Sequence, residues 1–284
     1  MALRLGATAL NKLYLGGTAI NKAYLGANVL FSPIAGFNPA TMFGTGIQGA
    51  WYDPSDLTTL FRDTAVPPIV PVTAAGQSVG TMLDKSGNDN HIRQSSAARR
   101  PTYRNGSGLH WLEFDGVDDT MGVIGINLTG TNKMGVVAGV RKLSDNQEGH
   151  VVGTIVGYNK NPGAFHIRAP SNSGAGNYGV LFDGDSFVTV TSDNSFAAPH
   201  SAVITVMRDL SVPSLDFRIN SSLVGTSNSS HSVSNFGNYL LYIGSRNGLH
   251  NRFNGLLYGL IIVGKSVSTT ELADAEIYMT GKTI

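Results

Sequence analysis

Phe253-Asn-Gly-Leu-Leu-Tyr-Gly-Leu-Ile-Ile-Val263, near the end of the chain, is the segment most indicative of the architecture. Its part from Leu256 to Val263 is almost wholly apolar and contains no charge or proline, which is typical of a strand buried inside a β-protein. Shorter runs of the same kind, separated by turn residues, begin at residue 111. The expected strands are 111–114, 134–140, 151–156, 164–168, 178–182, 187–191, 202–207, 215–219, 239–243 and 256–263. So many strands with no helix between them predict an all-β sandwich or jelly roll.

One confident helix follows these strands. Ser268-Thr-Thr-Glu271 has the spacing of a capping box, in which the first and fourth side chains bond each other's backbone amides. Leu272, Ala275 and Met279 then recur at helical spacing before Gly281, so we expect a short C-terminal helix that ends there and covers a sheet with this stripe. Glu276 is expected on its outer face.

The N-terminus repeats itself every ten residues, as Leu13-Tyr-Leu-Gly-Gly-Thr-Ala-Ile-Asn-Lys22 illustrates. Gly6, Gly16 and Gly26 mark regular chain reversals, so each period predicts one strand of about seven residues in a small β-meander. Two or three such strands are marginal alone and imply a partner surface. The residues expected to dock are Leu13, Tyr14, Leu15, Ile20, Tyr24 and Leu25. We therefore expect a docking arm at 1–31, a Pro- and Gly-rich linker at 32–46, and the sandwich at 47–284.

Composition excludes several classes of protein. The chain has 284 residues, 14% of them charged, a net charge of +1 and no cysteine. It therefore has no disulfide, thiol catalysis or Cys-bound zinc, and its histidines show no zinc-ligand spacing. The basic residues of the arm are too sparse for nucleic-acid binding, and no run is long enough for membrane insertion. Without a signal-peptide pattern, we expect synthesis in a cytoplasm and a soluble product.

Two segments resemble the concanavalin A-like, or laminin-G-like, lectin and glucanase sandwich. They are Leu112-Glu-Phe-Asp-Gly-Val-Asp-Asp119, and Tyr242-Ile-Gly-Ser-Arg-Asn-Gly248 followed by the strand quoted above. The terminal helix is also similar to that family. The resemblance spans roughly residues 110 to 280 and implies a concanavalin A-like jelly roll.

A second resemblance covers nearly the whole chain. Trp51-Tyr-Asp-Pro-Ser-Asp-Leu-Thr-Thr-Leu-Phe61, Leu83-Asp-Lys-Ser-Gly-Asn-Asp-Asn-His91 and Ala98-Arg-Arg-Pro-Thr102, with the Tyr-Leu-Gly repeat, resemble structural proteins of tailed bacteriophages and prophages. This implies a virion protein, such as a tail fibre or surface-adhesion component, made in the host cytoplasm. Its partners would be other virion proteins, two further copies in a homotrimer, and a host surface glycan for the lectin-like domain.

Two polar loop clusters could hydrogen-bond such a sugar. They comprise Asn88, Asp89, Asn90 and His91 in the first, and Arg246, Asn247 and His250 in the second. Ordinary turn chemistry explains both clusters at least as well, so this alternative stays open. Residues 64–110 have little periodicity and are expected to form a long surface excursion that could line a site.

Calcium is the cofactor that the lectin resemblance implies. Asp183 and Asp185 are the first candidates, and Asp115, Asp118 and Asp119 are the second, because calcium prefers carboxylate and carbonyl oxygens. An Asp-Gly-Asp between two apolar runs is also a hairpin turn, and that reading competes with a metal site.

Glu113-Phe-Asp115-Gly-Val-Asp118 is similar to the Glu-x-Asp-x-x-Glu pattern of glucanases with this fold. Here the last residue is one methylene shorter, and Gly116 predicts a turn, with Asp115 bonding local amides, rather than a continuous strand. Retaining hydrolysis needs two carboxyls about 5.5 Å apart, which this arrangement would miss. We therefore expect no enzyme. The alternatives are a capsid or tail decoration protein without a ligand and, less favoured, a glycan hydrolase.

Overall fold

The computed structural model describes residues 4–5, 8–9, 13–15, 18–20, 23–25, 28–31, 37–154, 162–184, 187–230 and 233–283; side chains are described from residue 37 onward, except that of Ile124. The chain forms two compact units, Met1–Asn38 and Pro39–Ile284, which are described separately. Within the expected 32–46 linker, Pro39–Met42 forms a short 3-10 helix whose Pro39 and Met42 are buried in the second unit.

Each N-terminal period forms its own two-stranded antiparallel pair. The pairs are β1 (Arg4–Leu5) with β2 (Thr8–Ala9), β3 (Leu13–Leu15) with β4 (Thr18–Ile20), and β5 (Ala23–Leu25) with β6 (Asn28–Phe31). One period therefore supplies two short strands and not one of about seven residues, because the chain reverses within the period. The predicted docking residues lie on β3, β4 and β5, and their side chains fall outside the described residues.

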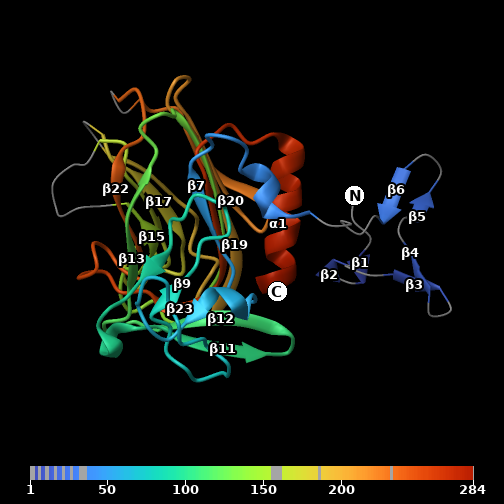
Figure 1. Cartoon of the computed structure of the whole chain (residues 1–284). Coiled ribbons are helices and arrows are strands. Elements are labelled where there is room, and N and C mark those ends of the chain that lie inside the picture. The colour runs from blue at the N-terminus through green and yellow to red at the C-terminus, as the bar shows by residue number, and fades with distance from the viewer. Residues whose placement is uncertain are drawn as a thin grey trace. The chain divides into compact units, whose positions relative to one another are not determined.

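The second unit is a sandwich of two antiparallel sheets (Figure 1). The nine-stranded sheet has the order β18-β17-β16-β15-β22-β13-β10-β9-β8. Its strands are β8 (Leu60–Phe61), β9 (Thr81–Met82), β10 (Ile92–Arg93), β13 (Met121–Asn127), β15 (His150–Gly153), β16 (Phe165–Arg168), β17 (Gly179–Phe182), β18 (Val188–Thr191) and β22 (Asn238–Ile243).

The eight-stranded sheet has the order β11-β12-β23-β14-β19-β20-β21, and β7 also pairs with β23. Its strands are β7 (Gly49–Tyr52), β11 (Thr102–Gly106), β12 (Leu109–Asp115), β14 (Lys133–Lys142), β19 (His200–Asp209), β20 (Ser214–Ile219), β21 (Ser222–Ser227) and β23 (Asn254–Val263). Two further 3-10 helices, η2 (Leu57–Thr59) and η3 (Ala97–Arg99), lie in the connections. The predicted all-β jelly-roll sandwich is confirmed.

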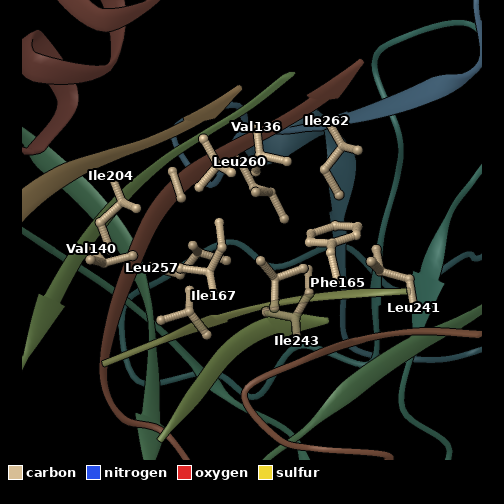
Figure 2. Packing of buried hydrophobic residues seen from close by; sticks show 14 of the residues in the cluster. Val136, Val140, Phe165, Ile167, Ile204, Leu241, Ile243, Leu257, Leu260 and Ile262 are labelled. Carbon is tan, nitrogen blue, oxygen red and sulfur yellow. The ribbon is translucent and has the colours of Figure 1, made fainter. Parts of the chain in front are cut away.

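The core lies between the two sheets, as Figure 2 shows. Leu257, Leu260 and Ile262 of β23 project into it and are fully buried. Phe165 of β16 and Ile243 of β22 come from the opposite sheet. Alternation places Leu260 and Ile262 on the same face, and the register shift in the pairing with β14 brings Leu257 to that face as well. β23 is central because β14 pairs along one edge while β12 and β7 share the other. The core covers one face of β23 and α1 packs against the other, which explains why the quoted run is apolar on both faces.

The C-terminal helix α1 (Thr269–Thr283) covers the outer face of the eight-stranded sheet, against β14, β19 and β23. Its capping box is confirmed: Glu271 N–H donates to Ser268 Oγ at 3.2 Å, and Ser268 N–H donates to Glu271 Oε2 at 3.0 Å. The helix continues through Gly281, so the expected end there is wrong. Helical backbone tolerates a glycine at modest cost when the neighbouring turn is packed.

The buried face of α1 also differs from the expected stripe. Ala275 and Met279 are buried, but Leu272 is only half-buried and Glu276 is 2% exposed. Glu276 was expected on the outer face, and the structure instead pairs its Oε1 with Arg218 Nε of β20 at 2.9 Å. Periodicity predicts an apolar contact through Leu272, whereas the structure has a salt bridge through Glu276 at the interface between the helix and the sheet.

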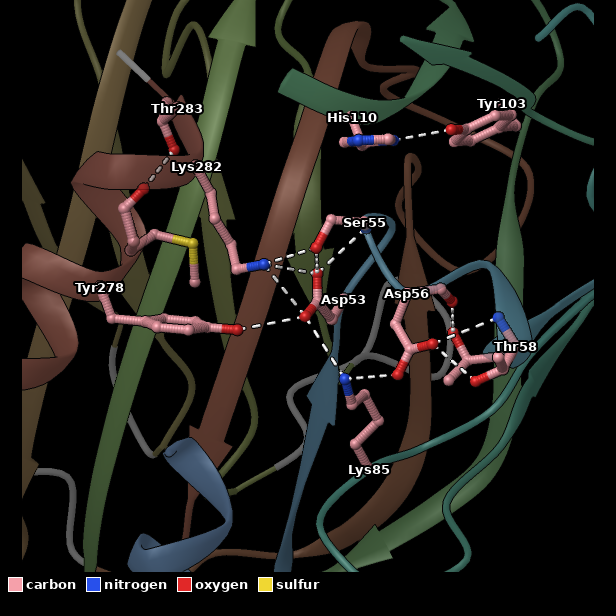
Figure 3. Close-up of polar contacts among 12 residues, drawn as sticks. Asp53, Ser55, Asp56, Thr58, Lys85, Tyr103, His110, Tyr278, Lys282 and Thr283 are labelled. Carbon is pink, nitrogen blue, oxygen red and sulfur yellow. Dashed lines mark hydrogen bonds and ion pairs between the residues drawn. The ribbon is translucent and has the colours of Figure 1, made fainter. Parts of the chain in front are cut away.

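A charge cluster around the buried Asp53 ties α1 to the loop after β7 (Figure 3). Lys282 Nζ lies 2.9 Å from Asp53 Oδ1, and the Tyr278 hydroxyl donates to Asp53 Oδ2 at 3.1 Å. Lys85 bridges Asp53 and Asp56. Burial alone would raise the pKa of Asp53, but Lys282, Ser55 and Lys85 hold it below its usual value. Since every charge in the cluster has a partner, its role is structural.

No helix in the described part of the chain is long and apolar enough to cross a membrane.

Candidate ligand-binding site

A pocket of about 360 Å³ opens on the outer face of the nine-stranded sheet. We call it the Arg93 pocket. Its volume lies within the range of about 300–1,000 Å³ that is usual for small-molecule sites. The lining residues come from β10 and its continuation, η3, β13, β22 and the loop after β22: Arg93, Gln94, Arg99, Thr120, Met121, Gly122, Tyr242, Asn247, Gly248 and Leu249.

Strand pairing explains why the pocket forms at this place. Arg93 pairs with Gly122, and Gly122 pairs with Tyr242, so the three residues form one row across three neighbouring strands. Their chain neighbours Ile92 and Ile243 are fully buried in the core, so this row faces outward. Gly122 has no side chain, which leaves the floor open between the guanidinium and the aromatic ring. A Cβ there would lie 3.4 Å from Tyr242 Cδ1.

The loop from Arg246 to His250 forms one wall. It closes on itself, because Arg246 N–H donates to His250 O at 2.8 Å and His250 N–H donates to Arg246 O at 3.0 Å. Asn247 and Gly248 both have left-handed backbone, with φ of 48° and 72°. The Gly248 carbonyl accepts hydrogen bonds from Arg99 and from Arg252 Nη2. These bonds fix the wall before any ligand arrives.

The pocket carries positive charge. In the described part of the chain, neither Arg93 nor Arg99 forms an ion pair with a carboxylate, and Arg93 Nε has no hydrogen-bond partner. Arg99 donates to backbone carbonyls, including that of Asp118 at 3.4 Å. Burial and the nearby Arg99 lower the pKa of Arg252, an effect that Asp118 and its neighbours partly offset.

Asn247 and Tyr242 supply neutral groups beside these charges. Asn247 Oδ1 is a buried acceptor without a partner among the described residues. Tyr242 is half-buried, and its ring lies close to both Gly122 and Gly248. Leu249 at the rim is 61% exposed. Aromatic and apolar surface next to a few hydrogen-bonding groups is the usual make-up of a pocket that binds small polar ligands.

The two predicted ligand-binding loops have different locations. Asn247 lines the Arg93 pocket directly, while Arg246 and the exposed His250 form the base of the same loop. Residues 88–91 do not line the pocket, and they form the β9–β10 connection. The structure therefore does not bring the two clusters together around one cavity.

Residues 88–91 mostly satisfy backbone groups. Asn88 Nδ2 donates to Ile47 O at 3.1 Å, and Asn90 Nδ2 donates to Gly49 O at 2.8 Å. His91 Nδ1 accepts from the Asp84 N–H at 3.1 Å, whereas the Asp89 side chain is exposed. These bonds hold the loop against the start of β7.

The first calcium candidates are only partly described. Asp185 lies outside the described residues, and Asp183 is fully buried. One Asp183 oxygen, Oδ2, lies 3.9 Å from His166 Nε2. The segment joins the paired strands β17 and β18, as the hairpin reading expects.

The second calcium candidates form a compact acidic turn. The carboxylates of Asp115, Asp118 and Asp119 lie within 4.8 Å of one another. Asp115 Oδ1 accepts from the amides of Val117 and Asp118 at 2.8 and 3.2 Å, which confirms its expected turn role. Burial, with Asp115 and Asp118 adding to it, raises the pKa of Asp119 to about 7. Asp119 is therefore about half protonated near neutral pH.

Glu113 of the hydrolase-like motif is engaged elsewhere. Its Oε2 lies 2.8 Å from Arg104 Nε on the neighbouring strand β11. Asp115, two residues along, is at the end of β12 and bonds the turn amides. The motif thus spans a strand and a turn.

Sequence reasoning missed Arg93, Arg99 and Tyr242. Tyr242 lies between Leu241 and Ile243 in an expected strand, so alternation alone would have placed it on the outer face. Arg93 and Arg99 come from the 64–110 stretch, which lacks periodicity, and only pairing with β13 shows where they lie.

Comparisons with known proteins bear on the fold. No protein-family model matches the sequence, and no curated protein is similar to it. The structure is similar to the binding domain of botulinum neurotoxin serotype G, with a TM-score of 0.54 and 12% identity over 70% of this chain and 49% of that one. It is also similar to the serotype D ligand binding domain in complex with N-acetylneuraminic acid, with a TM-score of 0.51 and 14% identity over 71% and 48% of the two chains. The chain thus spans about half the length of these domains, and it shares with them the jelly-roll sandwich fold.

Proposed function

We propose that this chain is a non-enzymatic surface-adhesion protein of a tailed-bacteriophage particle that binds a host glycan in the Arg93 pocket. The pocket itself carries the proposal, since it combines a half-buried tyrosine with hydrogen-bonding groups that have no partner among the residues that the structure describes. Sugars present one apolar face and a rim of hydroxyls, which fit such a surface. The serotype D neurotoxin domain, bound to N-acetylneuraminic acid, shows that a sandwich of this kind can hold a sugar.

The particle-bound part of the proposal rests on the N-terminal repeat and on the resemblance to phage structural proteins. Three short hairpins bury little surface alone and would gain stability by docking on other virion proteins. We propose that residues 1–31 make this contact, that the assembled protein is a homotrimer, and that it resides on the virion after synthesis in the host cytoplasm.

Glycan binding is tested by exposing the purified chain to a glycan array and measuring hits by calorimetry. We expect saturable binding that Tyr242→Ala abolishes. Tyr239→Ala is the matched control, because Tyr239 lies on the same strand but outside the pocket. Absence of any glycan binding would leave the decoration protein as the better function. Release of reducing ends from a host polysaccharide, lost in Glu113→Gln, would show a hydrolase.

A further inference from the structure

The Arg93 pocket has a charge that its own protein does not balance. Arg93 has no carboxylate or hydrogen-bond partner among the described residues, and Arg99 is held only by carbonyl oxygens. A half-buried guanidinium without a counter-ion is unusual, because desolvating a charge costs free energy unless a partner offsets it. An anion supplied by a ligand would provide that partner.

The acidic turn nearby does not supply this anion. Asp115 is bound by the backbone amides of its own turn, and the pKa of Asp119 is raised to about 7, so its carboxyl is only about half ionised at neutral pH. Asp118 contributes its backbone carbonyl to Arg99, and its carboxylate acts on Arg252. None of these carboxylates lines the pocket or lies within ion-pair distance of Arg93.

The row of three strands also sets the size of the ligand. Neighbouring strands lie about 4.8 Å apart, so Arg93 and Tyr242 are separated by roughly 10 Å across Gly122. A sugar ring can pack on Tyr242 in this space while an acidic substituent reaches Arg93. Carboxylate matches the planar guanidinium in a two-bond geometry. Asn247, in the wall of the pocket, can hydrogen-bond a ring hydroxyl or an amide substituent of the sugar.

We propose that the Arg93 pocket selects saccharides that carry a carboxylate, with Arg93 binding the acid group and Tyr242 packing on the sugar ring. The proposal rests on the glycan-binding function above and adds the ligand class. Sialic acids and uronic acids share this chemistry. A polyanion such as nucleic acid does not fit, because recognition of its backbone needs an extended basic surface and the pocket is small, with two arginines and the apolar Leu249 in its lining.

The test compares acidic sugars with their neutral derivatives on the full chain. Calorimetry is carried out with the methyl glycosides of N-acetylneuraminic acid and of galacturonic acid, with the methyl ester of each, and with sodium sulfate. We expect at least one acid to bind about tenfold or more tightly than its ester, and binding to weaken as sodium chloride is raised.

Variants then assign the acid group to Arg93. Arg93→Gln should weaken binding of the acid by about 10- to 100-fold, the usual worth of a hydrogen bond to a charged group, and leave the ester unchanged. Arg93→Lys should restore part of the affinity, since it keeps the charge but not the two-bond geometry. The matched control is Arg62→Gln, an arginine outside the pocket. Thermal melts confirm that each variant is folded.

Three outcomes would overturn the inference, and they are distinguishable. Neutral glycans that bind with dependence on Tyr242 but not on Arg93 would leave the proposed function standing and remove the acidic class. Sulfate that binds with dependence on Arg93 while no sugar binds would show a simple anion site. Binding of no glycan, acidic or neutral, would remove both proposals together.

Discussion

Glu276 is a polar side chain at the interface between α1 and the eight-stranded sheet. It is 2% exposed and accepts a hydrogen bond from Arg218, whose side chain is itself 26% exposed. Arg218 lies on β20 and also donates to the Ser221 carbonyl at 2.6 Å, so removing the negative charge leaves its half-buried guanidinium with a carbonyl but no counter-ion among the described residues. Helical spacing cannot reveal this, because the partner is 58 residues away in sequence.

We predict that Glu276→Gln lowers the free energy of unfolding by about 1.5–3 kcal/mol, as expected for losing a hydrogen bond between charged groups. Urea unfolding measures the change. Asp274→Asn on the same helix is the control, because the Asp274 side chain makes no hydrogen bond or ion pair with any described residue, and it should shift the midpoint very little. Equal effects of the two substitutions would show that the Glu276 pair does not stabilise the helix.

His150 and His166 form a second residue-scale feature, on the outer face of the nine-stranded sheet. Both are almost fully buried, and their Nδ1 atoms lie 3.0 Å apart, so one ring donates and the other accepts. Burial lowers the pKa of both rings; for His166, the neighbouring His150, Arg168 and Arg246 lower it further, whereas Glu148 partly opposes the shift at His150. The folded state therefore keeps both rings neutral.

This predicts a loss of stability on acidification that starts below pH 6.5, the usual pKa of an unfolded histidine. The unfolded chain binds more protons there, so the free energy of unfolding falls as the pH falls toward the lowered pKa values of the folded state. Thermal melts between pH 7 and 5 measure the slope. His166→Gln should flatten it, whereas His250→Gln, at an exposed position, should not. An unchanged slope in His166→Gln would show that other groups cause the loss.

At the scale of elements, α1 can approach the sheet because two glycines face each other beneath it. Gly139 of β14 pairs with Gly259 of β23. A Cβ on Gly139 would lie 2.2 Å from Thr283 Oγ1, and one on Gly259 would lie 3.0 Å from Met279 Sδ. Because these two positions carry no side chain, α1 can pack closely against the sheet there.

We predict that Gly139→Val lowers the melting temperature by more than about 2 °C, since overpacking a fitted interface costs roughly 1–3 kcal/mol. Valine is favourable in a β-strand, so any decrease in melting temperature can be attributed to its contact with the helix. Gly130→Ala is the control, because a Cβ there meets nothing within 4 Å. A neutral Gly139→Val would mean that α1 moves away without cost.

Most of the sandwich could be predicted from the sequence. All ten expected strands overlap observed ones, although residues 155–156 fall outside the described part. Such runs are apolar because one or both faces are buried. Among the missed strands, β13 has glycines at 122 and 125 that resemble turn residues, and β21 is partly exposed and lacks an apolar run. The two-residue strands β8, β9 and β10 carry too few residues for any period.

The candidate site was predictable only in part. The loop at 246–250 has a turn signature, and Tyr242 follows from alternation, but Arg93 and Arg99 become site residues only through pairing of β10 with β13. Residues 88–91 are predicted as site residues but do not line the pocket. Their side-chain amides are groups that could bind a sugar, but here they donate to backbone carbonyls at and before the start of β7 and hold the turn in place.

At the scale of the whole molecule, the arm and the sandwich form separate compact units. We predict that deleting residues 1–31 leaves the melting temperature of the sandwich within about 1–2 °C of that of the intact chain, because single-unit stability depends on its own core. The same deletion should abolish incorporation into particles. Melting curves and particle purification measure the two effects. Particles that still contain the truncated protein would exclude the arm as the docking element.

The arm has one further consequence, which concerns how its length can change. The three hairpins turn at equivalent points, with Leu5 opposite Thr8, Leu15 opposite Thr18 and Leu25 opposite Asn28. All pairing occurs within a period and none between periods among the described strands. Loss or duplication of one whole ten-residue unit would therefore keep every remaining backbone bond, whereas a change of any other size would break a hairpin. Natural variation in this arm should thus proceed in complete modules, so that related chains carry two, three or four copies with the sandwich unaltered.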